Sequence, residues 1–169
     1  MKSLNELTLT VFSLLLILTN LFILQLSCKK VKNKSLNEEN NIKSSYGIWI
    51  FLLSIPLIIN SYKTISLYME AIDIIFKNDN QRIVLLFTTS FLFIGLNSIW
   101  YFIGYYTSKL LSFSFLRKRN IQTEMSNGNI SYFLIRGIVF IMATISLLPL
   151  FELIIRIFMP NLTIPAFYS

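Results

Sequence analysis

Apolar positions gather into four long runs along the chain, at about residues 7–26, 46–62, 83–107 and 133–158. Within these runs apolar residues do not alternate with polar ones at a period of two, which argues against strands. At 1.5 Å per residue each run forms a helix of roughly 25 to 40 Å, enough to cross a hydrocarbon layer of about 30 Å. The pattern predicts an all-α integral membrane protein, a bundle of four transmembrane helices.

Between the runs lie two longer polar loops, residues 27–45 and 108–132, and the second loop contains a turn signal at residues 126–129. No repeat and no separate soluble segment interrupts the chain. We therefore expect residues 1–169 to form a single membrane domain.

Composition supports a lipid environment. Hydrophobic residues make up 54% of the chain and charged residues 14%, with a mean hydropathy of +0.64, whereas soluble domains carry about 25% charged residues. The net charge of +7 would suggest nucleic acid in a soluble protein. Here basic loops that fix membrane orientation explain it better. We expect the bilayer as a partner, and no nucleic acid.

The distribution of Lys and Arg predicts the orientation. Ten lie on the side of loops 27–45 and 108–132, and five lie on the other side. Since cytoplasmic loops carry the excess of basic residues, both loops are predicted to be cytoplasmic and both termini outside, in a plasma or inner membrane. The run Arg117, Lys118 and Arg119 is also a candidate for lipid headgroups, although orientation alone accounts for it.

Residues 63–77 continue the second run with a polar stripe at helical spacing, formed by Lys63, Ser66, Glu70, Asp73 and Lys77. Three placements stay open. This amphipathic helix lies in the outer interface, or extends the second helix towards residue 76 beyond the membrane, or itself spans the membrane with its charges facing a watery or partnered interior. The third placement makes its charged residues candidates for an ion pathway.

The stretch "LPLFELIIRIF" places Glu152 and Arg156 one turn apart on one helical face. Arg136 lies 20 residues before Arg156, so two guanidinium groups that snorkel to opposite headgroup layers would bracket the hydrocarbon. The first interpretation of the pair is therefore interfacial, and the alternative is a functional pair at a pathway mouth. The ion-pathway candidates are Lys63, Glu70, Asp73, Glu152 and Arg156.

The first and third runs carry stripes of small and polar residues near heptad spacing. Helices in lipid associate through small residues and side-chain hydrogen bonds. Asn20 lies 13 residues past Leu7, and Asn97 lies 14 past Ile83, so we predict a hydrogen bond between these amides. The alternative is that each bonds its own helix or another subunit. The candidate contact residues are Ser13, Asn20, Ser90, Asn97, Gly104 and Ser108.

Aromatic residues predict one membrane face. Tyr46 and Trp49 share an expected level with Trp100, Tyr101, Tyr105 and Tyr106, as in an interfacial belt.

The N-terminal segment has a second interpretation, because "LQLSCKK" resembles the end of a lipoprotein signal, with Cys28 as the lipidated residue. The 20-residue apolar stretch and Gln25 argue against that start.

Catalytic chemistry has little support in the chain. It contains no His and one Cys, which excludes His acid–base catalysis, Cys/His zinc sites and an intrachain disulfide. No phosphate loop or nucleophile triad is present. We expect no enzyme, no cofactor and no metal.

The predicted function is that of an accessory or assembly subunit, which acts through helix–helix contacts with other membrane subunits or by self-association. The alternatives are a small oligomeric channel or transporter with a charged outer vestibule, and a membrane immunity or stress protein.

Overall fold

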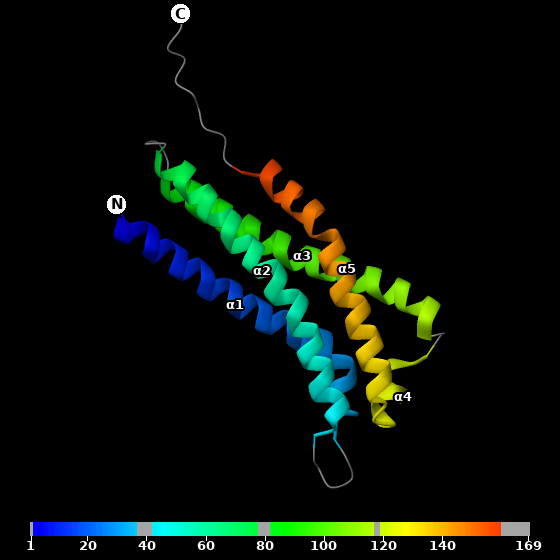
Figure 1. Cartoon of the computed structure of the whole chain (residues 1–169). Coiled ribbons are helices and arrows are strands. Elements are labelled where there is room, and N and C mark those ends of the chain that lie inside the picture. The colour runs from blue at the N-terminus through cyan, green and yellow to red at the C-terminus, as the bar shows by residue number, and fades with distance from the viewer. Residues whose placement is uncertain (1, 37–41, 78–81, 117–118, 160–169) are drawn as a thin grey trace, which may run out of the picture.

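A computed structural model describes residues 2–36, 42–77, 82–116 and 119–159. Its elements are all helices: α1 (Lys2–Lys32), α2 (Ser44–Lys77), α3 (Arg82–Leu116), α4 (Ile121–Ser126) and α5 (Ile130–Ile157) (Figure 1). Four of them, α1, α2, α3 and α5, are long and apolar enough to cross a membrane. The prediction of an all-α chain with four such helices is confirmed.

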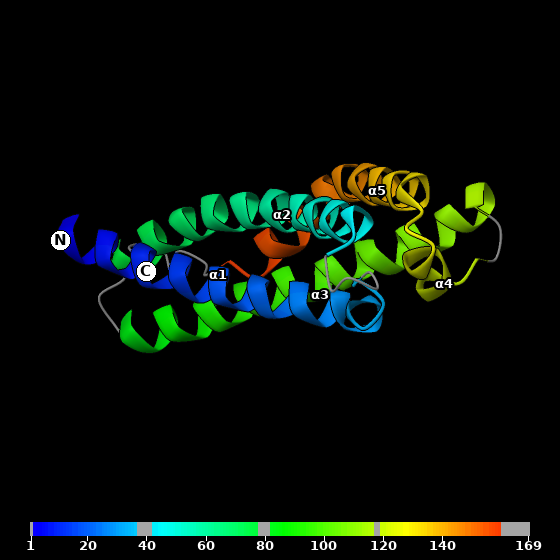
Figure 2. The same cartoon turned by 90° about the horizontal axis from the view of Figure 1, so that it is seen from below.

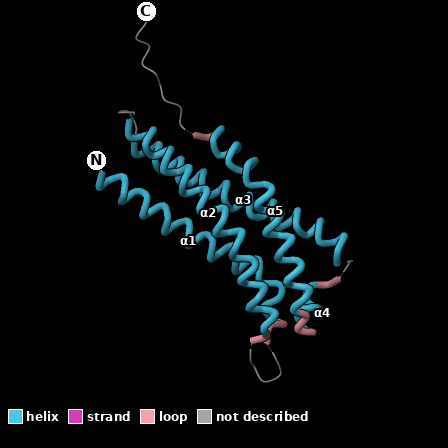
Figure 3. The backbone as a smooth tube through the Cα atoms, viewed as in Figure 1, coloured by secondary structure: helices cyan, strands magenta, loops and turns pink. Residues whose placement is uncertain are grey.

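The long helices form two layers, with α2 and α5 on one side and α1 and α3 on the other (Figure 2). Helix α5 packs against α2 and α3, and α1 packs against the same two helices. The start of α1 and the end of α5 lie at the same end of the bundle, while α4 lies at the opposite end (Figure 3). We call these the terminal end and the α4 end.

The helices run further than the apolar runs, so parts of both expected loops are helical. Residues 27–32 belong to α1, whose last turn carries Lys29, Lys30 and Lys32, where the helix dipole favours positive charge. Residues 108–116 belong to α3, because that stretch holds one charge, Lys109, among mostly apolar neighbours. The turn predicted at residues 126–129 is present, and within it Gly128, with a φ of 63°, lies between α4 and α5.

Residues 63–77 are the second half of the continuous helix α2. The ring of Tyr68 stacks on Phe12 of α1 with centroids 3.7 Å apart, and its hydroxyl lies 2.6 Å from Ser90 Oγ of α3. This half of α2 therefore runs alongside the apolar starts of α1 and α3. That arrangement excludes a separate helix lying flat in an interface.

The interior consists of two apolar clusters with a polar layer between them. One cluster, at the terminal end, includes Phe12, Tyr68 and Phe151. The other, at the α4 end, includes Trp49 and Phe133. Helices α2 and α5, which contain Pro56 and Pro149, are bent (Figure 1), as expected where proline removes a backbone hydrogen bond.

Candidate functional site

Polar side chains from three helices meet in the layer between the apolar clusters, and we call Asn20, Asn60, Ser61, Thr64 and Asn97 the amide cluster. Asn97 Nδ2 donates to Asn20 Oδ1 at 3.2 Å, so the hydrogen bond predicted between these two side chains is present. Asn20 Nδ2 in turn lies 2.6 Å from Ser61 Oγ, and Thr64 Oγ1 donates to Asn97 Oδ1 at 3.3 Å. The cluster thus ties α1, α2 and α3 together.

The contribution of α2 to this cluster was missed from the sequence. The second apolar run ends at residue 62, so hydropathy alone puts Ser61 and Thr64 at the end of the run and gives no sign that they are interior. The spacing from Asn60 to Thr64 is one helical turn, and both side chains are buried. Asn60 Oδ1 has no hydrogen-bond partner among the described residues.

A second assembly, the ion network, joins α2 to α5 through Lys63, Glu70, Glu152 and Arg156. Glu152 Oε2 lies 2.6 Å from Lys63 Nζ, and Glu152 Oε1 lies 3.0 Å from Arg156 NH2. Arg156 NH1 also lies 2.8 Å from Glu70 Oε2. The pair expected within α5 is therefore half of a network of two cations and two carboxylates.

The ion network lies on the surface of the bundle. The side chains of Lys63 and Glu152 are 28% and 29% exposed, and those of Arg156 and Glu70 are 47% and 46% exposed. Asp73, the fifth ion-pathway candidate, is exposed and makes no ion pair with a described residue. The structure thus brings four of the five candidates together and leaves Asp73 apart.

Contacts with α1 and α3 give the depth of this network. Lys63 is next to Thr64, which bonds Asn97, and Glu70 lies two residues past Tyr68, which contacts Phe12 and Ser90. Along the length of the bundle, the network therefore lies at the same level as residues 12–20 of α1 and 90–97 of α3. Both stretches belong to apolar runs that continue further towards the terminal end.

The remaining contact candidates have different neighbours from one another. Ser90 bonds Tyr68 of α2, as described above, and Ser108 Oγ donates to the carbonyl of Tyr105 in its own helix at 2.8 Å. A Cβ added to Gly104 would lie 3.3 Å from Phe140, so Gly104 serves the α3–α5 contact. Ser13 is half-buried, and its hydroxyl has no hydrogen bond to any described residue.

Gly137 is a contact residue that the sequence did not reveal. A Cβ added there would lie 2.5 Å from Leu52 Cδ1 and 2.6 Å from Leu52 Cβ, so α5 and α2 approach more closely than a larger residue allows. Gly137 is isolated in the sequence, without a second small residue four positions away on the same face, and this left no motif to recognise.

At the α4 end, Arg136 does not extend to a headgroup layer as expected but is 8% exposed. Its guanidinium carbon lies 5.5 Å from the ring centre of Trp49, 5.9 Å from Tyr105 and 6.0 Å from Tyr132. Trp49, expected in an outward belt, is 1% exposed. Aromatic rings at this level therefore surround a cation inside the protein, a favourable arrangement for a desolvated guanidinium.

The basic run after α3 is described in part. Arg117 and Lys118 lie outside the described residues. Arg119 is exposed, and its NH1 lies 3.5 Å from Glu124 Oε1 of α4. Lys43 Nζ donates to the carbonyl of Ser126 at 2.7 Å, so the charges at this end also hold α4 in place.

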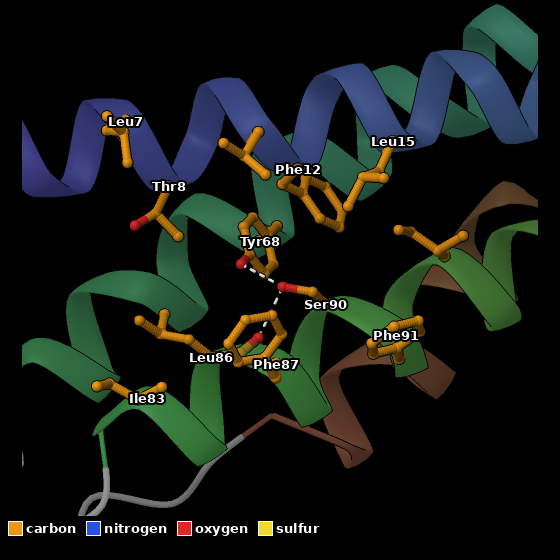
Figure 4. A pocket seen from close by; sticks show the side chains of 12 residues that line it. Leu7, Thr8, Phe12, Leu15, Tyr68, Ile83, Leu86, Phe87, Ser90 and Phe91 are labelled. Atoms are coloured by element: carbon orange, nitrogen blue, oxygen red, sulfur yellow. Dashed lines mark hydrogen bonds between the residues drawn. The ribbon is translucent and has the colours of Figure 1, made fainter.

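An apolar groove separates α1 from α3 near the terminal end (Figure 4). It encloses about 230 Å³, and its lining is almost entirely apolar apart from Thr8, Tyr68 and Ser90. Figure 4 shows the hydrogen bond that joins Tyr68 of α2 to Ser90 of α3. No Asp, Glu, Lys or Arg side chain lines the groove next to Tyr68 and Ser90.

Comparison with known protein families, curated proteins and solved structures found no match for the chain. Within the described ranges, no group of three or more Cys, Asp and Glu side chains could hold a metal ion. One of the two polar assemblies is neutral, with Asn60 Oδ1 the member that lacks a partner among the described residues, and the other consists of paired groups with balanced charge. Their chemistry suits helix association and recognition.

Proposed function

We propose that the protein is an accessory or assembly subunit of a larger membrane complex, which it contacts through the face formed by α2 and α5. This face carries the ion network, whereas the exposed side chains of α1 and α3 in the terminal half of the bundle are mostly apolar. The proposal includes a bilayer orientation with both termini outside.

The observation that carries the proposal is the depth of the ion network. Lys63 and Glu152 lie beside the amide cluster, which is 13 to 14 residues inside the apolar runs of α1 and α3. At 1.5 Å per residue that is roughly 20 Å from the starts of those runs. If lipid surrounds α1 and α3 along these runs, the same lipid would reach the four charged side chains on the other face.

Charged side chains in hydrocarbon are costly, on the order of 2.5 to 3.5 kcal/mol each at the centre of a helix on insertion scales. Pairing lowers this cost, but the exposed parts of the four groups still need polar surroundings. A partner helix with polar or charged side chains would supply them. This requirement favours a subunit whose α2–α5 face is covered in its complex.

The second candidate is an oligomeric channel or transporter. A shallow hollow of about 510 Å³ lies over Glu152 and Arg156 and is also lined by Pro149, Leu153 and Ile157. Several copies arranged around this face would enclose a charged vestibule. The two candidates differ in what covers the α2–α5 face. In a subunit it is another membrane protein, and in a channel it is a water-filled vestibule enclosed by further copies of the chain.

Cross-linking from this face tests both candidates. In a Cys28→Ser background, Ser66→Cys places one thiol on the charged stripe of α2, and Thr88→Cys places a matched thiol on α3, close to the level of Ser90. Both positions are exposed. Native membranes would be treated with a maleimide–benzophenone reagent and irradiated, so that the labelled thiol becomes linked to C–H bonds of any neighbouring protein. The products would be identified by mass spectrometry.

The subunit proposal predicts a cross-link from Ser66→Cys to one other membrane protein in fixed stoichiometry, and little product from Thr88→Cys. A product of twice the chain mass from Ser66→Cys alone, together with rapid labelling by a membrane-impermeant maleimide, would replace it with the oligomeric channel. Equal products from both positions, or none from either, would contradict both candidates.

A further inference from the structure

A pocket of about 290 Å³ lies between the C-terminal end of α3 and the start of α5, away from the ion network. Its lining residues are Phe115, Leu116, Arg119, Asn129, Ser131, Tyr132 and Ile135. Two of the lining residues, Phe115 and Ile135, are apolar and exposed, at 72% and 41%.

Arg119 supplies a positive charge to this pocket. Its side chain is 55% exposed, and the distance of 3.5 Å to Glu124 Oε1 is long for a charge-assisted hydrogen bond, which is commonly 2.7 to 2.9 Å. The other oxygen of Glu124 accepts from Asn129 Nδ2 at 2.5 Å. Glu124 is therefore already held by a neutral donor, and most of the Arg119 guanidinium is left available.

Tyr132 connects the pocket to the buried cation Arg136. Arg136 NH1 donates to the Tyr132 hydroxyl oxygen at 2.8 Å, so the hydroxyl proton of Tyr132 is free to donate elsewhere. Arg136 is 8% exposed and has no carboxylate within salt-bridge distance among the described residues. The three aromatic rings around Arg136 offset only part of the cost of burying a cation without a counter-charge, and an anion bound against Tyr132 would offset more of it.

We propose that this pocket binds the phosphate group of an anionic phospholipid from the leaflet at the α4 end. Arg119 and the Ser131 hydroxyl contact the phosphate, Tyr132 donates to it, and Arg136 acts through Tyr132. The apolar surface of Phe115 and Ile135 borders the pocket, where it suits the glycerol and acyl chains. This border favours a lipid over a free phosphate ion, because a free ion has no apolar part that could contact Phe115 and Ile135.

Lipid binding at this pocket needs no protein partner, so the inference is independent of the subunit proposal. The test uses the full chain purified in a mild detergent. Native mass spectrometry would measure retention of phosphatidylglycerol and of phosphatidylcholine at equal concentration, with and without millimolar inorganic phosphate. The variants are Arg119→Gln, Arg136→Gln and Tyr132→Phe, with Lys32→Gln as control, since Lys32 is exposed at the same end but outside the pocket.

We expect phosphatidylglycerol to be retained at least about fivefold more than phosphatidylcholine, as one guanidinium–lipid attraction allows. Arg119→Gln and Arg136→Gln should each remove most of this preference, Tyr132→Phe should reduce it, and Lys32→Gln should keep it. Far-UV circular dichroism and gel filtration would show whether Arg136→Gln folds. If that variant does not fold, Arg119→Gln decides, because its side chain is on the surface.

Equal retention of the two lipids would overturn the proposal, as would an unchanged preference in Arg119→Gln. Complete displacement of phosphatidylglycerol by inorganic phosphate would show that the pocket takes the free anion, and would overturn the lipid assignment.

Discussion

At the scale of single residues, the amide cluster shows how polar groups hold helices together where lipid provides no hydrophobic drive. Asn20 both accepts from Asn97 and donates to Ser61, so one side chain links α1 to two other helices. Each such bond is worth roughly 0.6 to 2 kcal/mol in membrane proteins. Because these hydrogen bonds share their members, their contributions to stability are coupled.

The Asn20–Asn97 bond predicts energetic coupling between the two side chains. Asn20→Leu and Asn97→Leu should each lower the free energy of unfolding, and the double variant should lose less than the sum by about 0.5 to 1.5 kcal/mol. Unfolding by SDS in mixed dodecyl maltoside micelles measures all four proteins. Strictly additive losses would show that the two amides do not stabilise each other. Thr10→Leu, on the exposed side of α1, is the control.

Part of this residue-level picture followed from counting positions. Asn20 and Asn97 are polar residues at equal distances from the starts of two apolar runs, so their meeting was predictable. The surroundings of Arg136 were not, since its three aromatic neighbours are spread between residues 49 and 132. No local pattern shows that Trp49 and Tyr105 approach the same side chain from two different helices.

At the scale of helices, packing depends on where backbones approach closely. Gly104 faces α5, and Gly137 of α5 faces Leu52 of α2, so α5 has a close contact on each side. The sequence indicated Gly104, because Ser108 follows it at small-residue spacing, but Gly137 stands alone. Helix number and approximate limits were predictable from hydropathy, whereas the faces that meet depend on tertiary contacts.

Enlarging Gly137 should separate α2 from α5. In Gly137→Ala the new methyl group would clash with Leu52, and we expect a loss of about 1 to 3 kcal/mol in the free energy of unfolding, as for overpacking elsewhere. Gly95→Ala is the matched control: nothing lies within 4 Å of its added Cβ, and Ala is the better helix former. A neutral Gly137→Ala variant in the same micelle assay would show that the contact relaxes easily.

Helix α4 offers a separate prediction at this scale. Met125 is fully buried, and Lys43 donates to the carbonyls of Met125 and Ser126, so both residues help to hold this six-residue helix in place. Met125→Ala should cost about 2 to 5 kcal/mol if α4 stays docked, or should release α4. Hydrogen exchange would then rise in residues 121–126 and not in α2. Thr123→Ala, at an exposed position of the same helix, should change exchange little.

At the scale of the whole molecule, the two faces differ in chemistry. The α1–α3 face is mostly apolar towards the terminal end, with Glu6 as an exposed charge near the start of α1, whereas the α2–α5 face carries charge from Lys63 outward. The sequence contained this asymmetry as an amphipathic stretch after residue 62, but its position could not be decided until α2 was seen as one helix beside α1 and α3. A continuous helix places those charges within the bundle's length.

The same structure sharpens the prediction of orientation. Lys63 and Arg156 are bound in the ion network and Arg136 is buried, so none of the three acts as a free loop charge. Of the remaining Lys and Arg residues, nine lie at the α4 end and three at the terminal end. Because free basic residues near helix ends stay cytoplasmic, we expect the α4 end inside and both termini outside.

Reporter fusions measure this orientation. Alkaline phosphatase, which folds outside, should be active when fused after Met159, and green fluorescent protein should fluoresce when fused after Ser126. Replacing Lys29, Lys30 and Lys32 by Gln should weaken the bias and produce some molecules with the opposite orientation, because charges close to the helix ends count most. Replacing Lys63 by Gln should leave it unchanged, since that charge is paired with Glu152. Fluorescence after Met159 would reverse the orientation and place the α4 end outside.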